Sequence, residues 1–268
     1  VYPKEIQVFG FNAGLKDILQ ISPLAASAPS EFNLPNLVTM TAPLPVHIDA
    51  LARHLATQYQ AGDVILLYDT QDAASQQFLT PLRTAIRQVI KQAKVVDVQD
   101  DATLEQHVQL SGKNLVVVAT TNRYQLSPIL AHLRKLSDEL NYRIQLYGHP
   151  NWAKLEFADS DGLAALRARI TSSYYIDPES SEVRRFDRQY QQAFGIAPTE
   201  FAYKGYDAAR YFGRLLAQYG PGYRKHLERE SGQGLHNAFS FSYNPEWGYV
   251  NRAVTILQYG HGQFRPIN

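Results

Sequence analysis

The pattern of hydrophobic positions is clearest in residues 62–98, where it predicts a strand, a helix and a second strand. Residues 64–68 form an unbroken apolar run, which is too short for a helix and typical of a strand buried on both faces. Short polar side chains at 69–72 can cap a helix, and apolar residues then recur at helical spacing from Phe78 to Ile90. Residues 94–98 return to a β-branched run, so the stretch is a βαβ unit.

The same alternation continues on both sides of this unit. Further strands are predicted at 18–21, 37–40, 115–119, 143–147 and 170–176. Helices are predicted at 2–11, 46–60, 102–110, 126–140 and 163–169. After Asp177 the pattern changes to successive helices at 181–194, 202–219 and 223–229, followed by antiparallel strands at 235–241, 250–259 and 263–267. The sequence therefore predicts an α/β protein with parallel sheets flanked by helices.

Composition narrows the class of protein. The 268 residues, 45% of them hydrophobic, can bury a full core in one large domain or two lobes. Lys and Arg total 26 against 25 Asp and Glu, so a net charge of +1 gives no general attraction to nucleic acid, which we do not expect as a partner. The absence of Cys excludes thiol catalysis, thiolate metal sites and disulfides. No apolar run approaches the roughly 20 residues that span a bilayer, and we expect a processed or trimmed chain that begins after its true N-terminus.

Few side-chain patterns suggest chemistry. His47 and His54 stand seven apart on one predicted helix face, but no third ligand has metal-site spacing, which favours a surface helix over a metal site. The short glycine pairs indicate turns, and no nucleophile elbow or Walker loop is present. We therefore predict no catalytic residues, no metal and no cofactor. Among the aromatic residues, those between Tyr203 and Phe212 lie near helical spacing and are typical of a core, whereas Trp152 falls in a loop after a predicted strand and is a candidate ligand contact.

The order of elements and four stretches resemble the type I periplasmic binding proteins, the leucine-binding-protein-like superfamily. The stretches are Ile-Ser-Pro-Leu-Ala-Ala-Ser at 21–27, the strands at 64–68 and 115–119, and Phe-Ala-Tyr-Lys-Gly-Tyr-Asp-Ala-Ala at 201–209, which is the most specific. Within the superfamily, residues 1–5, 174–177 and 247–251 are similar to the binding-protein-like domain of Bacteroidetes envelope proteins that often carry LysM repeats, although this chain has no such repeat. Members of the superfamily normally open with two βαβ units that end in a Gly-Pro turn, and Val1 is similar to the residue that follows this turn. The resemblance thus implies a first lobe that is incomplete at its N-terminus.

The resemblance implies a two-lobed fold with three crossovers and a ligand in the cleft between the lobes. Lobe one would take residues 1–60 and 177–236, and lobe two would take 61–176 and 237–268. The cleft would be lined by loops at the carboxyl ends of parallel strands, where open α/β sheets bind ligands. The ligand-binding residues expected on these loops are Ser22, Ala25, Ser27, Asp69, Thr70, Thr121, Asn122, Arg123, Asn151 and Trp152.

The amino-acid-binding pattern of the superfamily does not carry over. In place of the hydroxyl contact this chain has Pro3, and in place of the backbone and Thr contacts it has Leu24 and Ala26. The two aromatic contacts correspond to Ala73 and to Asn122 or Arg123, and the acidic contact corresponds to Pro150. A buried ligand ammonium without a carboxylate partner would be costly. Arg123 instead presents donors that suit a carboxylate or phosphate, with Lys4 and His149 nearby if the lobes close as in the superfamily. An anionic peptide or acidic muropeptide is therefore preferred as ligand over a neutral amino acid; the alternative is that Arg123 faces solvent or pairs with Asp69 or Asp72.

Three classes of function remain. The first is an extracytoplasmic solute-binding receptor of the ABC-transporter type, located in the periplasm or cell envelope, free or as a lipoprotein, which takes an amino acid, peptide or muropeptide-like ligand. The second is a ligand-free interaction module that regulates peptidoglycan synthesis or envelope assembly, with a peptidoglycan synthase as partner. The third is an enzyme, for which the sequence offers no nucleophile, base and orienting group.

Overall fold

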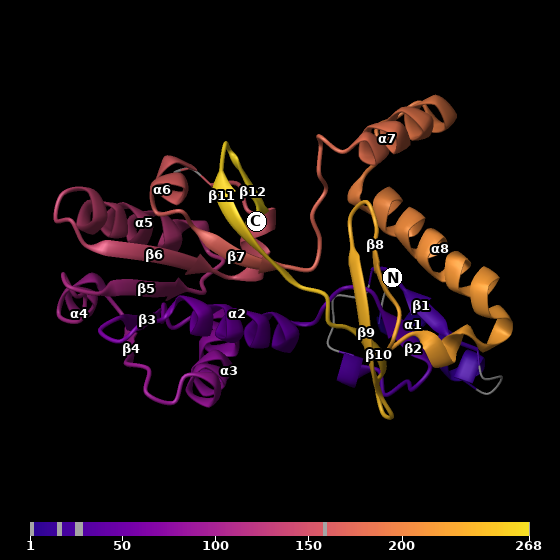
Figure 1. Ribbon diagram of the computed structural model, residues 1–268, viewed down its shortest axis with the longest axis horizontal. Helices are drawn as coiled ribbons and strands as arrows, with labels where there is room; N and C mark the ends of the chain where they lie inside the picture. The colour runs from indigo at the N-terminus through magenta and orange to yellow at the C-terminus, as the bar shows by residue number, and fades with distance from the viewer. Residues whose placement is uncertain (1–2, 15–17, 25–28, 158–159, 268) are drawn as a thin grey trace. The chain divides into compact units, whose positions relative to one another are not determined.

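The computed structural model, which describes residues 3–14, 18–24, 29–157 and 160–267, forms two compact units (Figure 1). Unit 1 comprises Val1–Val46 and Ser173–Val254, and unit 2 comprises His47–Ser172 and Thr255–Asn268. The chain therefore passes from one unit to the other three times, after residues 46, 172 and 254.

The positions of these passages differ from the predicted ones. Helix α2 (Leu44–Gln58) was expected in lobe one, but most of it packs in unit 2, where His47 Nδ1 lies 3.0 Å from Thr171 Oγ1. At the other end of the chain, β9 (Ala238–Asn244) and β10 (Gly248–Asn251) pair with each other in the sheet of unit 1. The first division thus comes after residue 46 instead of 60, and the last after 254 instead of 236.

Unit 2 is built on a seven-stranded sheet in the order β12-β11-β7-β6-β5-β3-β4. Its strands are β3 (Val64–Tyr68), β4 (Val95–Val98), β5 (Lys113–Val118), β6 (Arg143–Gly148), β7 (Arg169–Ser172), β11 (Thr255–Gly260) and β12 (Gln263–Pro266). The strands from β4 to β7 are parallel, β11 runs antiparallel to β7, and β12 runs antiparallel to β11. Every residue of β3 is buried, as its unbroken apolar run predicts.

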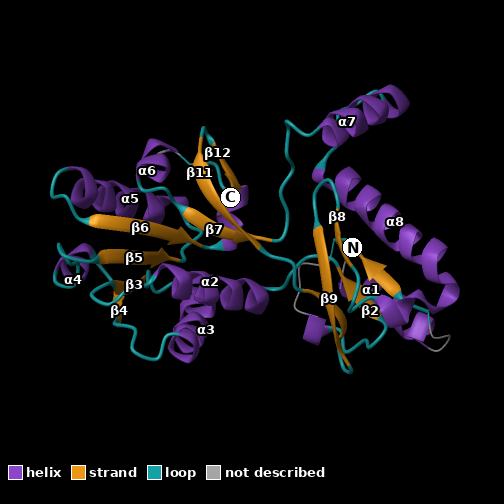
Figure 2. Ribbon diagram, in the orientation of Figure 1, coloured by secondary structure: helices purple, strands orange, loops and turns teal. Residues whose placement is uncertain are grey.

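Helices cover both faces of this sheet (Figure 2). They are α3 (Ala73–Val89), α4 (Asp101–Glu105), α5 (Arg123–Asp138) and α6 (Ser160–Ala165), together with α2 and the 3₁₀ segment η2 (Pro150–Lys154). The crossover from β3 to β4, which contains α3, runs towards one edge of the sheet, whereas the crossover from β5 to β6, which contains α5, runs in the opposite direction. Because both crossovers are right-handed, α3 and α5 lie on opposite faces of the sheet. The loops after β3, β5 and β6 all lie at the carboxyl edge of this sheet.

Unit 1 has a five-stranded sheet in the order β1-β2-β10-β9-β8. The remaining elements are α1 (Pro3–Gly14), β1 (Gln20–Ser22), η1 (Pro29–Glu31), β2 (Leu37–Thr39), α7 (Ser181–Phe194), α8 (Glu200–Tyr219), η3 (Gly220–His226) and β8 (Ser231–Gln233). Helix α8 packs Phe212 and Leu215 against Val38, whereas α1 packs Ile6 against Leu37. Because successive strand residues point to opposite faces, these two helices cover opposite faces of the sheet.

Two predicted elements take a different form. The strand expected at 250–259 is two strands, β10 in unit 1 and β11 in unit 2, because the chain passes between the units at the interruption. The helix expected at 223–229 is the 3₁₀ segment η3, which begins with Gly-Pro-Gly. Within the described part of the chain, no helix is both long and apolar enough to cross a membrane.

The expectation of an incomplete first lobe stays a prediction. Helix α1 leaves Val8, Phe9 and Phe11 61%, 67% and 67% exposed. An apolar groove of about 440 Å³ also lies between β1 and α8, lined by Ile21, Gly205, Ala209 and their neighbours.

A buried carboxylate fastens α8 to the turn between β8 and β9. Asp207 accepts hydrogen bonds from the backbone N–H groups of Leu235, His236 and Asn237, at 2.7, 2.8 and 2.8 Å. A Cβ atom at Gly234 would lie 2.3 Å from Asp207 Cγ, so only glycine lets the turn come this close. The most specific stretch of the sequence resemblance thus contains a structural carboxylate.

Candidate functional site

The loops after β3, β5 and β6 meet at the carboxyl edge of the sheet of unit 2. Thr120, just after β5, connects them. Its carbonyl oxygen accepts a hydrogen bond of 2.8 Å from Trp152 Nε1, and its side chain lies within hydrogen-bonding reach of the Asp72 carboxylate. Thr120 Oγ1 is also 3.0 Å from Gln125 Oε1, so its single hydroxyl proton can go to either acceptor.

Asp72 fixes the first of these loops to the start of α3. Its Oδ1 accepts a hydrogen bond of 2.8 Å from the Ser75 N–H, and its Oδ2 accepts one of 2.7 Å from Thr70 Oγ1. Burial acts to raise the pKa of Asp72, but hydrogen bonds from Thr120, Ser75 and Thr70 outweigh it and hold the pKa below its usual range. The site therefore contains a carboxylate that is ionised at physiological pH and lies at a helix N-terminus.

His149 is the buried residue that follows β6. Its Nδ1 accepts a hydrogen bond of 3.0 Å from the Asn151 N–H, and its ring packs on Phe78 with 5.1 Å between ring centres. Burial lowers the pKa of His149 to about 4, and the nearby Asp72 carboxylate opposes this only in part. The imidazole is consequently neutral at physiological pH and carries its proton on Nε2.

The solvent-facing side of the site is formed by the start of α5. Asn122 caps this helix, with its Oδ1 3.0 Å from the Tyr124 N–H. Arg123 is exposed, donates to the Tyr124 hydroxyl at 3.1 Å and lies with its guanidinium carbon 5.1 Å from the Tyr124 ring centre. It forms no ion pair with Asp69 or Asp72, and the Asp69 carboxylate instead accepts from the Gln71 N–H at 2.8 Å. Among the described residues, the Arg123 guanidinium therefore has only a neutral partner, the Tyr124 hydroxyl, at the surface.

Trp152 has a different position from the one expected of a ligand contact. Its side chain is 0% exposed and packs on Gly148, where a Cβ atom would come within 2.1 Å of the indole ring. Phe157 packs edge-on against it, with 5.9 Å between ring centres. The loop position that suggested a ligand contact thus holds a core residue of unit 2, because the Gly148 backbone leaves room for the indole to fold inward.

The other expected site residues divide between the units. Thr70 is engaged with Asp72, whereas Thr121 and Asn151 lie near the surface at the carboxyl edge of unit 2. Ser22 ends β1 in unit 1, where it is buried and its hydroxyl has no hydrogen-bond partner among the described residues. Ala25 and Ser27 lie outside the described residues. The meeting of the two sets in one inter-lobe cleft stays a prediction.

The loops that the sequence predicts do meet at this edge, but sequence reasoning left out three of their inward-facing residues as site members, Asp72, Thr120 and His149. Each is among the first polar residues after a buried strand, and that position is the signal that could have found them. His47 and His54 both face β7, and His47 is buried, which corrects the expectation of a surface helix. In the described ranges, no three His, Cys, Asp or Glu side chains are grouped so that they could hold a metal.

Comparison with known proteins agrees with this architecture. A family model described as "Periplasmic binding protein" matches residues 13–232. Among solved structures, a branched-chain amino acid ABC transporter periplasmic ligand-binding protein from Burkholderia xenovorans is 13% identical, with a TM-score of 0.60 over 98% of this chain and 73% of its own. An ABC transporter substrate-binding protein from Desulfitobacterium hafniense, solved in complex with Leu, is 14% identical, with a TM-score of 0.58 over 98% of this chain and 78% of its own.

A third similar structure comes from a protein with a different name. Full-length LpoA from Haemophilus influenzae is 13% identical, with a TM-score of 0.53 over 98% of this chain and 50% of its own. At such identities these likenesses concern the fold alone. No curated protein sequence matches this chain.

Proposed function

The chain belongs to the periplasmic binding protein family, and from that premise we propose that it is a non-catalytic extracytoplasmic receptor that binds a small solute for a membrane transporter. The observation that carries this proposal is the junction of three loops around Thr120, at the carboxyl edge of the sheet of unit 2. Open α/β sheets bind ligands at this edge. Of the two groups of residues there, Asp72, Thr120, Asn122 and His149 hold the loops in place, and Thr121, Arg123 and Asn151 face outward, where they can contact a solute.

The electrostatics of the outward-facing group favour a ligand with a carboxylate. Helix α5 begins at Arg123, and its cap is the neutral side chain of Asn122, so the partial positive charge of the helix end is not cancelled there. The exposed Arg123 guanidinium adds a full positive charge in the same turn. At the start of α3, in contrast, the Asp72 carboxylate already occupies the corresponding position. An anionic group of the ligand is therefore expected at α5, and hydrogen-bond donors of the ligand are expected near Asp69.

The amino-acid pattern of the superfamily is absent from the sequence, and we therefore propose a short peptide, or an acidic muropeptide-like compound, ahead of a free neutral amino acid. Asp69 is half-buried and accepts one hydrogen bond from the backbone, which leaves acceptor capacity for a ligand N–H. Isothermal titration with paired ligands, each tested as the carboxylate and as its neutral amide, measures the contribution of the anionic group. The carboxylate of a pair should bind more tightly than the amide.

The residue-level test compares Arg123→Ala with Arg134→Ala. Arg134 is an exposed arginine near the other end of α5, where it pairs with Asp138 at 3.2 Å. Losing a hydrogen bond to a charged group costs about 1.5–3 kcal/mol, which corresponds to roughly 10- to 150-fold weaker binding. Arg123→Ala should show this loss for the carboxylate but not for the amide, and Arg134→Ala should bind like the parent chain. Unchanged affinity in Arg123→Ala would disprove the anionic contact while leaving a binding role intact.

The second candidate function is a ligand-free interaction module that regulates peptidoglycan synthesis or envelope assembly. The burial of Trp152 favours it, because that aromatic side chain is withdrawn from the candidate site. The fold likeness to LpoA fits the same idea at the level of architecture. A ligand present at 100 times its dissociation constant should add about 2.7 kcal/mol of stability. A panel of amino acids, peptides, sugars and muropeptides that gives no thermal shift, together with direct binding to a purified peptidoglycan synthase, would favour the module over the receptor.

A further inference from the structure

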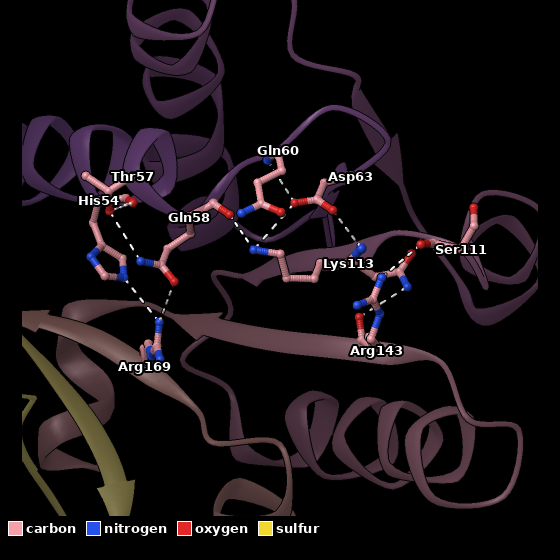
Figure 3. A network of polar contacts seen from close by, with 10 residues as sticks. His54, Thr57, Gln58, Gln60, Asp63, Ser111, Lys113, Arg143 and Arg169 are labelled. Atoms are coloured by element: carbon pink, nitrogen blue, oxygen red, sulfur yellow. Dashed lines mark hydrogen bonds and ion pairs between the residues drawn. The ribbon is translucent and has the colours of Figure 1, made fainter.

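Arg169 of unit 2 joins three elements, α2, β7 and β11, each of which lies next to a point where the chain passes between the units (Figure 3). Helix α2 contains the first passage, β7 ends at the second and β11 begins at the third. Arg169, the first residue of β7, contacts both of the other elements. Its Nε donates to Gln258 Oε1 of β11 at 3.1 Å, and its Nη1 lies 3.4 Å from Gln58 Oε1 and 3.4 Å from His54 Nε2 of α2.

All of these partners of Arg169 are neutral. Gln58 and Gln258 are amides, and burial together with the Arg169 charge lowers the pKa of His54 to about 4. Among the described residues, Arg169 has no carboxylate within ion-pair distance. Asp63, the carboxylate at the other end of the same network, forms an ion pair with Lys113, whose Nζ lies 3.6 Å from Asp63 Oδ2. The junction around Arg169 therefore carries an uncompensated positive charge.

A second group with a spare hydrogen-bond donor lies beside this charge. Tyr147 of β6 is the direct cross-strand neighbour of Arg169, so the two side chains share one face of the sheet. Its side chain is 0% exposed, and its hydroxyl proton has no acceptor in the part of the chain that the structure describes. Burial raises the pKa of Tyr147 to about 12, and the charge of Arg169 together with a hydrogen-bond contact from its guanidinium acts in the opposite direction, so the hydroxyl oxygen faces the guanidinium. A fully buried hydroxyl whose proton has no acceptor calls for a partner that accepts hydrogen bonds.

The balance of donors and acceptors defines what that group is. Arg169 has five N–H donors and Tyr147 has one O–H donor, and the acceptors around them are Gln58 Oε1, Gln258 Oε1 and His54 Nε2. The donors outnumber the acceptors, and the net charge is positive. A group that only accepts hydrogen bonds and carries one negative charge satisfies both conditions.

We propose that Tyr147, Arg169, Gln58 and Gln258 form a binding site for a small monovalent anion, either a halide or a carboxylate group. The anion accepts from the Tyr147 hydroxyl and from an Arg169 N–H, and it enters from the partly exposed side of Arg169. It joins β6 to β7, α2 and β11, and thereby strengthens the base of all three passages between the units. This site is separate from the solute site at α5 and does not depend on the proposed receptor function.

The experiment uses bromide and formate as probes on the full chain. Each is titrated at constant ionic strength against sodium gluconate, whose anion is much bulkier than either probe, and the dissociation constant is taken from the rise in the thermal unfolding midpoint. The control variant is Arg143→Gln: Arg143 also begins a strand of this sheet, contacts the Ser111 carbonyl at 2.8 Å and has no ion pair among the described residues. Arg169→Gln should weaken binding of both probes by about tenfold or more, and Arg143→Gln should leave it unchanged.

Tyr147→Phe provides the second test, because it removes only the hydroxyl and is expected to fold. It should weaken the probes by roughly three- to tenfold. Anomalous scattering from a bromide-soaked crystal should show the ion beside Arg169 and Tyr147. If the hydroxyl holds a water and bromide binds elsewhere, or if Tyr147→Phe and Arg143→Gln respond alike, the site is not an anion site.

Discussion

Replacement of Asp207 by alanine should destabilise unit 1 severely, and the structure allows the size of the effect to be worked out. One carboxylate oxygen accepts the Leu235 N–H, and the other accepts the N–H groups of His236 and Asn237. The side chain is 1% exposed. Alanine would therefore leave three backbone donors without their acceptor in the interior.

Each hydrogen bond to a charged group contributes about 1.5–3 kcal/mol net, but the three share one carboxylate and are not additive. Breaking a buried charged interaction by removing one partner costs about 3–5 kcal/mol, and we expect Asp207→Ala to fall in this range. Asp207→Asn should cost about 2 kcal/mol, because its oxygen can keep two of the donors while its NH₂ group faces the third. Against a total stability of about 5–15 kcal/mol, the alanine variant comes near the limit of a stable unit.

The two tryptophans allow the units to be followed separately, since Trp152 lies in unit 2 and Trp247 in unit 1. In a Trp152→Phe background, Trp247 fluorescence reports the urea unfolding of unit 1, and a Trp247→Phe background reports unit 2. With a slope of about 2 kcal/mol per M urea, Asp207→Ala should lower the unit 1 midpoint by about 2 M. Glu179→Ala is the control in the same unit, because that carboxylate forms an exposed pair with Arg184 and should cost at most about 1 kcal/mol. The reasoning is refuted if Asp207→Ala and Glu179→Ala shift the midpoint equally, or if amide exchange at 235–237 is unchanged.

Two further predictions concern unit 2. Gly148→Ala should cost about 1–3 kcal/mol and shift Trp152 emission to the red, because the new Cβ atom would lie 2.1 Å from the indole ring; an unshifted spectrum would show that the ring does not move. The pKa values of His54 and His149 are both lowered to about 4, whereas histidine in an unfolded chain titrates near 6.5. Between these values only the unfolded chain takes up the protons, so unit 2 should have constant stability above pH 7 and lose stability as the pH falls from 6.5 towards 4. The Trp152-reported urea midpoint at pH 7.5 and at pH 5 measures this loss, which His149→Asn should reduce, and equal midpoints would contradict the prediction.

The elements that the sequence predicts best are those whose pattern is continuous and local. The apolar run of β3 and the leucine-rich face of α5 each identify a buried element without reference to any other part of the chain. The passages between the units have no such signal. Residues 250–259 alternate as one strand would, yet β10 and β11 belong to different sheets. Which sheet a strand joins is decided by partners far away in the sequence, here β9 for β10 and β7 for β11.

The role of single residues shows the same limit. Asp207 belongs to the most specific stretch of the family resemblance, but its partners are backbone groups 28 to 30 residues away, at Leu235, His236 and Asn237. Trp152 looked like a ligand contact because of its loop, and it is a core residue because Gly148 leaves space beneath it. A sequence pattern gives the position of a loop, whereas the direction of each side chain depends on the caps and on the space around it.

The caps also explain how the candidate site separates into two groups. Asp72 and Asn122 both cap helices that start at the carboxyl edge of the sheet, so their side chains are held by backbone N–H groups and fix where each helix begins. The residue directly after the cap, such as Arg123, then points to solvent with few contacts of its own. In the proposed receptor, substitutions in the inward-facing group should therefore change affinity by moving a loop, and substitutions in the outward-facing group should change it by removing a contact. Its specificity should then depend mainly on the outward-facing group, whose side chains can vary without loss of the fold.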